Sequence, residues 1–522
     1  MKKIVLSSPI LTILPTLALI PVLGGVISGM HDGGLPILSQ FFTASLHPSL
    51  EPMVLQSAFK GLQITIATAL LSWTISTFAG LFLGLFGSNI FWNSFKLNKR
   101  IPIFIRRFLA VPRSIHELIW GLLLLQIFGI NPWVAILAIC IPYSCLVARV
   151  FSDQIDNLDP SALIAIRQSG SGPIAALTTS LLPPIIPVIN SYCGYRLECA
   201  LRGATMLGLF GLGGIGTELN LTLQSLEFQE MWTSLWMLGV VMFFLETILT
   251  WWRRNPSSPH QSERNFLISI GIMLATVGIS FVWLKSLDIN LLSSLKWHSI
   301  NLPTLTEIKN AFYELPWINL IWSTTVMTLL AAGISIGTPA LSMMLWPTRT
   351  GGVIQSCIWS LLRLIPAPLS ALLLLLCTSP NISVAALALG LHNLGVMGRF
   401  LKEGISHQSN NIYIALRTAG SGNRMAWLYG QLSLQSRSYL AYSAYRTDVL
   451  MRETAVVGVV GGVGLGWQLQ ESLSSFNWAQ VFLVTATYST LTLIGESMSE
   501  SSREFWLKPF ENIPNHSLKP GS

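Results

Sequence analysis

The sequence predicts an all-α polytopic membrane protein with about twelve transmembrane helices, arranged as two parallel repeats of six. Three observations support this fold class. Of the 522 residues, 51% are hydrophobic and only 10% are charged, too few to build the polar surface of a soluble protein. Apolar runs of about 20 residues, the length that crosses a hydrocarbon core, recur along the chain. The third observation is an internal repeat.

Each predicted span is an apolar run of suitable length. The first six spans are expected at 9–29, 55–86, 110–129, 132–151, 174–195 and 229–252. The second six are expected at 265–285, 318–346, 353–377, 383–401, 425–445 and 478–498. The opening "MKK" and its apolar run resemble a secretory signal, but the run is long and no small-residue cleavage pattern closes it. We therefore interpret it as a retained first span.

The basic residues lie near the ends of the predicted spans. The formal net charge is +8, and a cytoplasmic N-terminus would place the basic loops in the cytoplasm, as the positive-inside rule requires. These loops are 92–107, 149–172, 253–264, 399–424 and the C-terminal tail. The charge therefore indicates membrane orientation, and we expect a lipid membrane but no nucleic acid as a partner.

The two sets of spans predict two domains. The boundary falls at the polar stretch "RRNPSSPHQSER", which is rich in proline and serine. We expect a first repeat at 1–252, a cytoplasmic linker at 253–264, a second repeat at 265–503 and a cytoplasmic tail at 504–522.

A single shift aligns the halves without a gap. Gly170 of "AIRQSGSG" aligns with Gly420 of "ALRTAGSG", a shift of 250 residues. The same shift pairs Arg113 with Arg363, Asn131 with Asn381, Arg149 with Arg399, Asp153 with Glu403, Arg167 with Arg417, Tyr195 with Tyr445, Gly208 with Gly458 and Glu246 with Glu496. An even number of spans per half makes both halves enter the membrane in the same direction, as a parallel pseudo-twofold pair.

A glycine-rich phrase occurs once in each half. "LRGATMLGLFGLGGIGTELN" at 201–220 contains G-x-G-x-x-G, and "MRETAVVGVVGGVGLGWQLQ" at 451–470 is its counterpart. A dinucleotide site would need a βαβ unit and an acidic residue about 20 positions further on. These glycines instead lie in an apolar run, and the second copy has another spacing. We expect them to let charged helix ends approach each other across the pseudo-twofold axis.

Charged residues come directly before these glycines, in "YRLECALR" and "YRTDVLMR". Ionisable groups near membrane depth usually face partners, water or a transport path. The candidates for such a path are Arg196, Glu198, Arg202, Arg446, Asp448 and Arg452. The alternative is a set of structural ion pairs in which Glu198 and Asp448 neutralise the neighbouring arginines. Both interpretations stay open at this stage.

The chain lacks the motifs of an enzyme or a metal site. Its six cysteines lie in apolar runs without a C-x-x-C pattern, its eight histidines are scattered, and no G-x-x-x-x-G-K-[S/T] occurs. We predict no catalytic residue, metal or cofactor. Any nucleotide chemistry would belong to another chain.

Two groups of residues resemble a known family. "ALIAIRQSGSG", followed by Leu182 and Pro183, resembles the cytoplasmic EAA loop of ABC importer permeases. "YRLECALRGATMLGLFGLGGIG", "YRTDVLMRETAVVGVVGGVGLGWQLQESL" and "RSIHELIWGLL" resemble the phosphonate-type permeases. The resemblance covers about 113–252 and 363–503, as in two permease units fused in tandem.

The chain departs from the family pattern at a few positions. Ile164 and Ile414 replace the glutamate that opens the EAA motif, and Ser433 replaces the closing proline of the second copy. The second half also has Pro366 and Ala367 where the first has His116 and Glu117. We therefore expect the path to differ between the halves.

The resemblance implies a transport permease, not an enzyme, in a bacterial inner membrane. It would import phosphonate or a related oxyanion such as phosphite by alternating access, with a periplasmic or lipoprotein binding protein. Two separate ATPase subunits would dock at loops containing Arg167, Gly170, Gly172, Arg417, Gly420 and Gly422. Alternatives are a permease for another small solute such as D-methionine, a secondary transporter, or a membrane scaffold.

Overall fold

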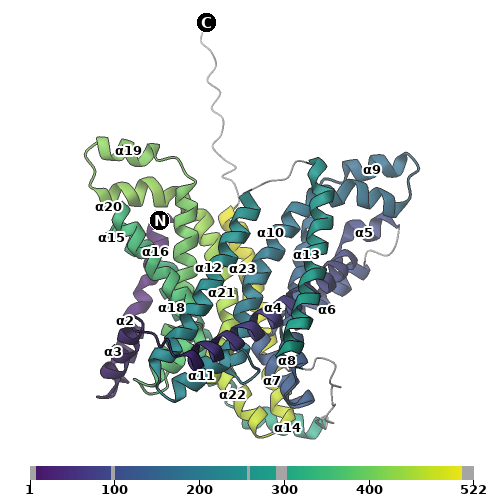
Figure 1. The fold of residues 1–522 in the computed structure, drawn as a ribbon. Helices are drawn as coiled ribbons and strands as arrows, with labels where there is room; N and C mark the ends of the chain where they lie inside the picture. Colours follow the sequence, from purple (N-terminus) through teal and green to yellow (C-terminus); the bar gives the residue numbers. More distant parts are fainter. Residues whose placement is uncertain (1–7, 96–99, 255–258, 288, 290–302, 508–522) are drawn as a thin grey trace.

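The protein is helical throughout the part that the structure describes (Figure 1). This computed structural model describes residues 8–95, 100–254, 259–287, 289 and 303–507. Within these ranges the non-helical pairing is an isolated β-bridge between Met30 and Thr378. The fold class predicted from the sequence is confirmed.

The helices divide between the two halves of the chain as follows. The first half contains α1 (Ser8–Ile13), η1 (Leu14–Ala18), α2 (Leu19–Ser28), α3 (Gly34–Ala44), α4 (Pro52–Gly87), α5 (Asn89–Ser94), α6 (Arg100–Ser114), α7 (Glu117–Phe128), α8 (Pro132–Asp156), α9 (Ser161–Gln168), α10 (Pro173–Leu209), α11 (Ile215–Gln224) and α12 (Phe228–Arg254). The second half contains α13 (Pro259–Ser286), α14 (Leu305–Glu314), α15 (Trp317–Leu345), α16 (Arg349–Leu364), α17 (Ala367–Leu375), α18 (Ile382–Ser406), α19 (Asn411–Thr418), α20 (Asn423–Ala426), the π-helix η2 (Trp427–Leu432), α21 (Ser433–Gly461), α22 (Gly464–Ser474) and α23 (Trp478–Leu507).

Every predicted span falls on helical residues, either in one helix or in successive helices separated by a bend or a change of helix type. Among the described residues, six helices are long and apolar enough to cross a membrane, and four bent pairs bring the number of candidate spans to ten. The remaining two predictions, 265–285 and 478–498, lie within α13 and α23. The α6–α7 and α16–α17 pairs bend by 83° and 85°. The predicted linker falls on the end of α12, on the unplaced residues 255–258 and on the start of α13, and residues 508–522 of the predicted tail lie outside the described residues.

The repeated asparagines begin equivalent helices. Asn131 precedes α8 and its side-chain oxygen accepts a hydrogen bond from the backbone N–H of Trp133 at 3.0 Å. Asn381 precedes α18 and accepts one from Val384 at 2.9 Å. Each side chain thus satisfies a backbone donor that has no partner within its helix.

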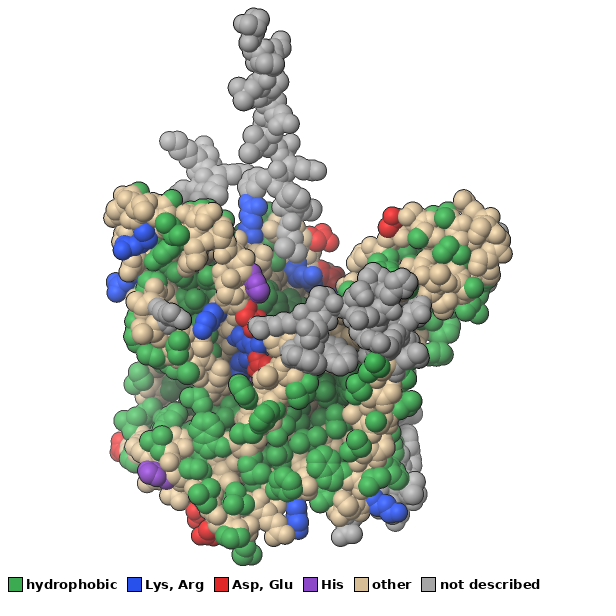
Figure 2. Space-filling model, turned by 45° about the horizontal axis from the view of Figure 1, so that its top comes forward, with side chains coloured by type: hydrophobic (Ala, Val, Ile, Leu, Met, Phe, Trp, Pro, Cys, Tyr) green, Lys and Arg blue, Asp and Glu red, His purple; other side chains and the backbone are tan. Residues whose placement is uncertain are grey.

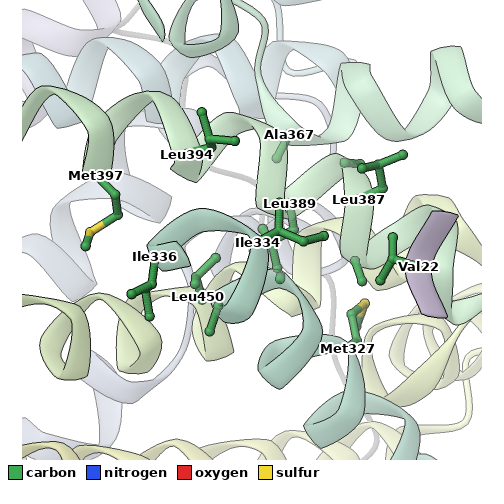
Figure 3. Close-up of a cluster of buried hydrophobic side chains, with 14 of the residues drawn as sticks. Val22, Met327, Ile334, Ile336, Ala367, Leu387, Leu389, Leu394, Met397 and Leu450 are labelled. Carbon is green, nitrogen blue, oxygen red and sulfur yellow. The ribbon is translucent and has the colours of Figure 1, made fainter. Parts of the chain in front are cut away.

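The two halves exchange their first spans. Val22 and Val26 of α2 are buried in a hydrophobic cluster formed otherwise by second-half residues, among them Met327 and Leu389 (Figure 3). In the opposite direction, Leu284 of α13 packs with buried first-half residues of α4 and α8. The first span of each half therefore covers the core of the other half.

Backbone hydrogen bonds extend this exchange beyond the spans. Just after α2, the N–H of His31 donates to Cys377 O at 3.2 Å, and the N–H of Ser379 donates to Gly29 O at 2.9 Å. The loop between α17 and α18 is thus tied to the end of the first span. Separating the halves would expose both the apolar cluster and these backbone groups.

Adjacent glycines of α2 provide a test of this packing. A Cβ added at Gly25 would lie 2.8 Å from Ser383 Cβ on α18, whereas a Cβ at Gly24 meets nothing within 4 Å. We expect Gly25→Leu to lower the free energy of unfolding by about 1–3 kcal/mol, the usual cost of overpacking. Thermal unfolding of the purified chain in detergent measures this change.

The matched control is Gly24→Leu, which adds the same side chain one residue away on the open side. It should leave the unfolding temperature almost unchanged. Equal effects of both substitutions would contradict the packing of the first span on the second half.

Candidate functional site

A cavity of about 640 Å³ lies between the two halves. Its charged wall comes from both repeats: Arg196, Arg202, Arg363, Arg399, Arg446 and Arg452, with Glu117, Glu198, Glu403 and Glu453. Figure 2 shows charged side chains gathered in a hollow of the otherwise largely hydrophobic body. Because six arginines face four carboxylates, the lining has an excess of positive charge.

The mouth of the cavity lies on the side of α9 and α19. Ser406 and His407 line it at the end of α18, directly before α19, while Met206 lines it near the far end of α10. Figure 1 shows α9 and α19 at the same end of the molecule, with α14 and α22 at the opposite end. The cavity therefore opens toward the end that carries both short helices.

The structure brings the sequence-predicted path residues together. Arg196, Glu198, Arg202, Arg446 and Arg452 all line this one cavity.

Two of these arginines are also neutralised by near neighbours. Arg202 pairs with Glu198 at 2.6 Å, one turn away on α10. Arg452 pairs with Asp448 in the same way on α21, and this pair links Asp448 to the cavity wall. Arg202 and Arg452 therefore line the cavity and also form structural ion pairs, so both alternatives left open by the sequence apply to them.

The glycine-rich phrase packs within each half. A Cβ at Gly208 would lie 2.6 Å from Gly213 O and 2.9 Å from Gly216 Cα, so α10 and α11 of one half approach closely there. In the second half, a Cβ at Gly458 would lie 3.2 Å from Gly466 Cα. The expectation that these glycines bring charged helix ends together across the axis is wrong.

These glycines instead form a tight turn that is fixed by a threonine. Gly213 and Gly214 have φ values of +92° and +86°, a region that favours glycine. The turn is fixed because the N–H of Ile215 donates to Thr65 Oγ1 at 2.8 Å. In the second half, the N–H of Leu465 donates to Thr324 Oγ1 at 3.0 Å. The sequence reasoning missed these threonines because they come from distant helices.

Ion pairs also connect the two halves. Arg113 of α6, which is 7% exposed, donates from Nη2 to both carboxylate oxygens of Glu496 on α23 at 2.9 Å. Arg149 of α8 pairs with the same Glu496 and with Glu500. A first-half arginine pair therefore holds the last helix of the second half.

The repeat generates the reciprocal ion pairs. Glu246 of α12 pairs with Arg399 and lies 3.7 Å from Arg363, which correspond to Arg149 and Arg113 by the 250-residue shift. Arg363 makes a further contact with Glu198 at 2.9 Å. We call these two groups the cross-half clusters. The repeat reveals their residues in the sequence, but not that each arginine finds its carboxylate on the opposite half.

The predicted docking loops have the same geometry in both halves. Gly170 follows α9 with φ +90°, and Gly420 follows α19 with φ +92°. Arg167 Nη1 donates to Ser171 O at 2.7 Å, and Arg417 Nη1 makes the equivalent bond to Ser421 O. These two arginines therefore brace the turn.

The residues that follow each turn begin the next helix. Gly172 and Gly422 are the N-caps of α10 and α20, with extended backbone conformations. On the outer face, Ile164 of α9 is 49% exposed and Ile414 of α19 is 53% exposed. Each short helix thus presents an isoleucine where the EAA pattern has a glutamate.

The described residues contain no group of three or more His, Cys, Asp or Glu side chains placed to hold a metal ion. All six cysteines are free thiols.

Comparison with known proteins identifies the family. Residues 76–255 match the family described as binding-protein-dependent transport system inner membrane component. A protein of Escherichia coli, named as a cryptic phosphonate transport system permease, is 30% identical over 94 residues, which are 18% of this chain and 77% of that protein. The chain belongs to the permeases of ABC importers.

Further relatives agree with this assignment. A phosphate-import permease protein of Mycolicibacterium smegmatis is 23% identical over 386 residues, 70% of this permease and 71% of that protein. This alignment is longer than either repeat and agrees with two permease units in tandem. A phosphite transport system permease protein of Stutzerimonas stutzeri is 31% identical over 118 residues, 23% of this chain and 43% of that protein.

One solved structure is similar to part of the permease. It is titled "Crystal structure of an amino acid ABC transporter with histidines" and matches 40% of this chain and 100% of that chain. Its TM-score of 0.33 and sequence identity of 18% make the likeness too weak to support an argument.

The cross-half clusters make a stability prediction. Glu496→Gln removes a carboxylate that is 13% exposed and leaves the buried Arg113 without its ion pair. Breaking such a pair from one side costs about 3–5 kcal/mol when it is fully buried. We expect a marked fall in the unfolding temperature of the purified permease, and Glu246→Gln should act in the same direction.

The control is Glu504→Gln, an exposed glutamate further along the same helix. It removes one negative charge without breaking a buried pair, so the unfolding temperature should stay close to that of the wild type. A Glu496→Gln protein as stable as this control would show that the cluster does not hold the halves together.

Proposed function

We propose that this permease imports a phosphorus oxyanion, such as phosphonate or phosphite, through the cavity between its halves. The observation that carries the proposal is the arginine-rich wall of that cavity, to which both repeats contribute. Guanidinium groups bind oxyanions through paired N–H donors and offset the cost of moving an anion through a membrane. The names of the relatives, which refer to phosphate, phosphonate and phosphite, favour the same class.

Separate ATPase subunits would supply the energy. We propose that one ATPase docks on α9 and the other on α19, because the two short helices share an end of the molecule and have the same turn geometry. The exposed Ile164 and Ile414 give each helix an apolar contact for its partner. A substrate-binding protein would dock at the opposite end, which in a bacterial inner membrane faces the periplasm.

Transport would proceed by alternating access. In the structure the cavity opens toward the proposed ATPase side, while the glycine turns of α10–α11 and α21–α22 lie at its far end. ATP-driven approach of the ATPases would move α9 and α19 together and rock the halves about their interface. The cross-half clusters lie at that interface, so their ion pairs would rearrange during the cycle.

The substrate class is tested by removing the permease from its host. We expect the deletion strain to lose uptake of methylphosphonate or phosphite and to grow poorly when that compound is the phosphorus source. Uptake of D-methionine should be unchanged, because the arginine-rich wall favours anions. Normal phosphorus uptake with impaired D-methionine uptake would replace the proposed substrate class by the amino acid.

The docking turns are tested by Gly170→Val and Gly420→Val. Neither position has an atom within 4 Å of an added Cβ, so the substitution acts through the positive φ, which a β-branched residue adopts only with strain. We expect the protein to insert and stay folded, because the strained turn is exposed and an added side chain displaces no packed neighbour, but to lose uptake and copurification of its ATPase.

Gly271→Val in α13 is the control, because its Cβ also meets nothing within 4 Å and its backbone is helical. It should keep full uptake. Normal uptake in both turn variants would contradict the docking proposal.

A further inference from the structure

Two equivalent arginines of the cavity have different surroundings. Arg446 of α21 is buried, and its Nε donates to Asn393 Oδ1 at 2.7 Å. Its Nη2 also donates to Asn393 and lies 3.3 Å from Glu453 Oε1. Asn393 Nδ2 in turn donates to Glu453 Oε2 at 2.7 Å. The charge and the donors of Arg446 are thus used within the second half.

The first half keeps the arginine but replaces both of its partners. By the 250-residue shift, Arg196 corresponds to Arg446, Tyr143 to Asn393 and Gly203 to Glu453. The guanidinium carbon of Arg196 lies 3.8 Å from the centroid of the Tyr143 ring. A ring face attracts the cation but offers no oxygen to the N–H groups in the guanidinium plane.

The cavity carboxylate that contacts Tyr143 has other partners. Glu117 of α7 accepts a hydrogen bond from the Tyr143 hydroxyl at 3.2 Å and lies 3.4 Å from His116 Nε2. It occupies the space beside Gly203, since a Cβ there would lie 3.3 Å from Glu117 Oε1. No ion pair connects Glu117 to Arg196 within the described part of the chain.

Arg196 is therefore an unpaired cation in the cavity wall. It is 7% exposed, and its Nε and Nη2 have no hydrogen-bond partner among the described residues. The other five cavity arginines each form an ion pair with a carboxylate; they are Arg202, Arg363, Arg399, Arg446 and Arg452. A buried charge without a partner is costly, so a counter-ion is expected at this position.

We propose that Arg196 binds the transported phosphorus oxyanion, and that the first half alone supplies this site while Arg446 has a structural role. The inference rests on the proposed function for the identity of the ligand. Nε and Nη2 of Arg196 form one edge of the guanidinium, which is buried without a hydrogen-bond partner. This edge can donate to two oxygens of one phosphoryl group when an anion enters beside it. The hydroxyls of Tyr195 and Tyr445, which line the same cavity, are further donors to the anion.

The experiment measures anion binding by the purified full chain in detergent. Methylphosphonate and phosphite are titrated at constant ionic strength, with chloride as the comparison anion, and the rise in unfolding temperature gives an apparent Kd. We expect a saturable rise with the wild type. Arg196→Gln should weaken the apparent affinity about 10- to 100-fold, the loss expected for a charge-assisted contact. Arg196→Lys keeps the charge without the planar fork and should fall between the two.

The stability of the unliganded variants separates a binding role from a structural one. Arg196→Gln removes an unpaired buried charge, so its unfolding temperature without anion should equal or exceed that of the wild type. Arg446→Gln leaves Glu453 without its ion pair and should lower the unfolding temperature, while the anion-dependent rise is retained from this lower starting point.

A triple variant tests the site with Arg196 intact. Glu117→Ala, Tyr143→Asn and Gly203→Glu together give the first half the residues of the second half at these positions. Arg196 should then bind its new neighbours, and the anion-dependent rise should disappear although the protein stays folded.

Uptake by cells that carry the wild-type permease distinguishes the two proposals. If these cells import methylphosphonate or phosphite but Arg196→Gln keeps the wild-type apparent Kd, the Arg196 site is wrong and the proposed function stands. The Arg196 site is also wrong, and the proposed function also stands, if the anions that these cells import do not raise the unfolding temperature of the purified wild type. If the wild type imports none of these anions, the proposed function itself is wrong.

Discussion

The structure depends on the need of each buried charge for a partner in a membrane-spanning interior. Arg113 and Arg363 meet this need with carboxylates of the opposite half, Glu496 and Glu246. Because a lone arginine or glutamate at such a depth is costly, the two halves stabilise each other most when they are docked. The exchanged first spans act in the same direction through apolar packing. The cavity therefore lies between two halves, each of which obtains ion-pair partners and an apolar covering helix from the other.

The covalent joining of the two units allows the halves to differ. A pair of identical subunits would place Tyr143 opposite another tyrosine and Gly203 opposite another glycine, and both central arginines would have the same partners. In this chain one arginine is satisfied by Asn393 and Glu453 while the other keeps free donors. The fold remains symmetric because the residues that shape the helices and turns repeat, whereas the residues around the two arginines do not.

Much of the fold could be predicted from the sequence because hydropathy and a constant shift are local signals. The spans, the repeat and the matching turns at Gly170 and Gly420 all follow from them. The exchange of first spans could not be predicted, since an apolar helix such as α2 does not specify in its own pattern which half it covers. The glycine phrase was assigned to the wrong contact because small residues indicate close packing but do not name the partner.

The residues of the candidate site could be predicted from the sequence, but the ion-pair partners of its arginines could not. The charged prefixes gave Arg196, Arg202, Arg446 and Arg452, which do line one cavity. That Arg446 is neutralised and Arg196 is not depends on Tyr143 and Asn393, which lie on other helices far away in sequence. Positions where a repeat changes chemical type, such as Gly203 and Glu453, are the signal that would have pointed to this difference.

The exchange of first spans also constrains the order of events during synthesis. Val22 packs in one cluster with Met327 and Leu389, which the ribosome adds more than three hundred residues later. At typical translation speeds of about 5–20 residues per second, the first span waits on the order of tens of seconds for its partners. During that time its apolar face is covered by lipid, so the wait carries little of the aggregation risk of an exposed core in water. Helices α15 and α18 then displace the lipid from the first span, after most of the chain has entered the membrane.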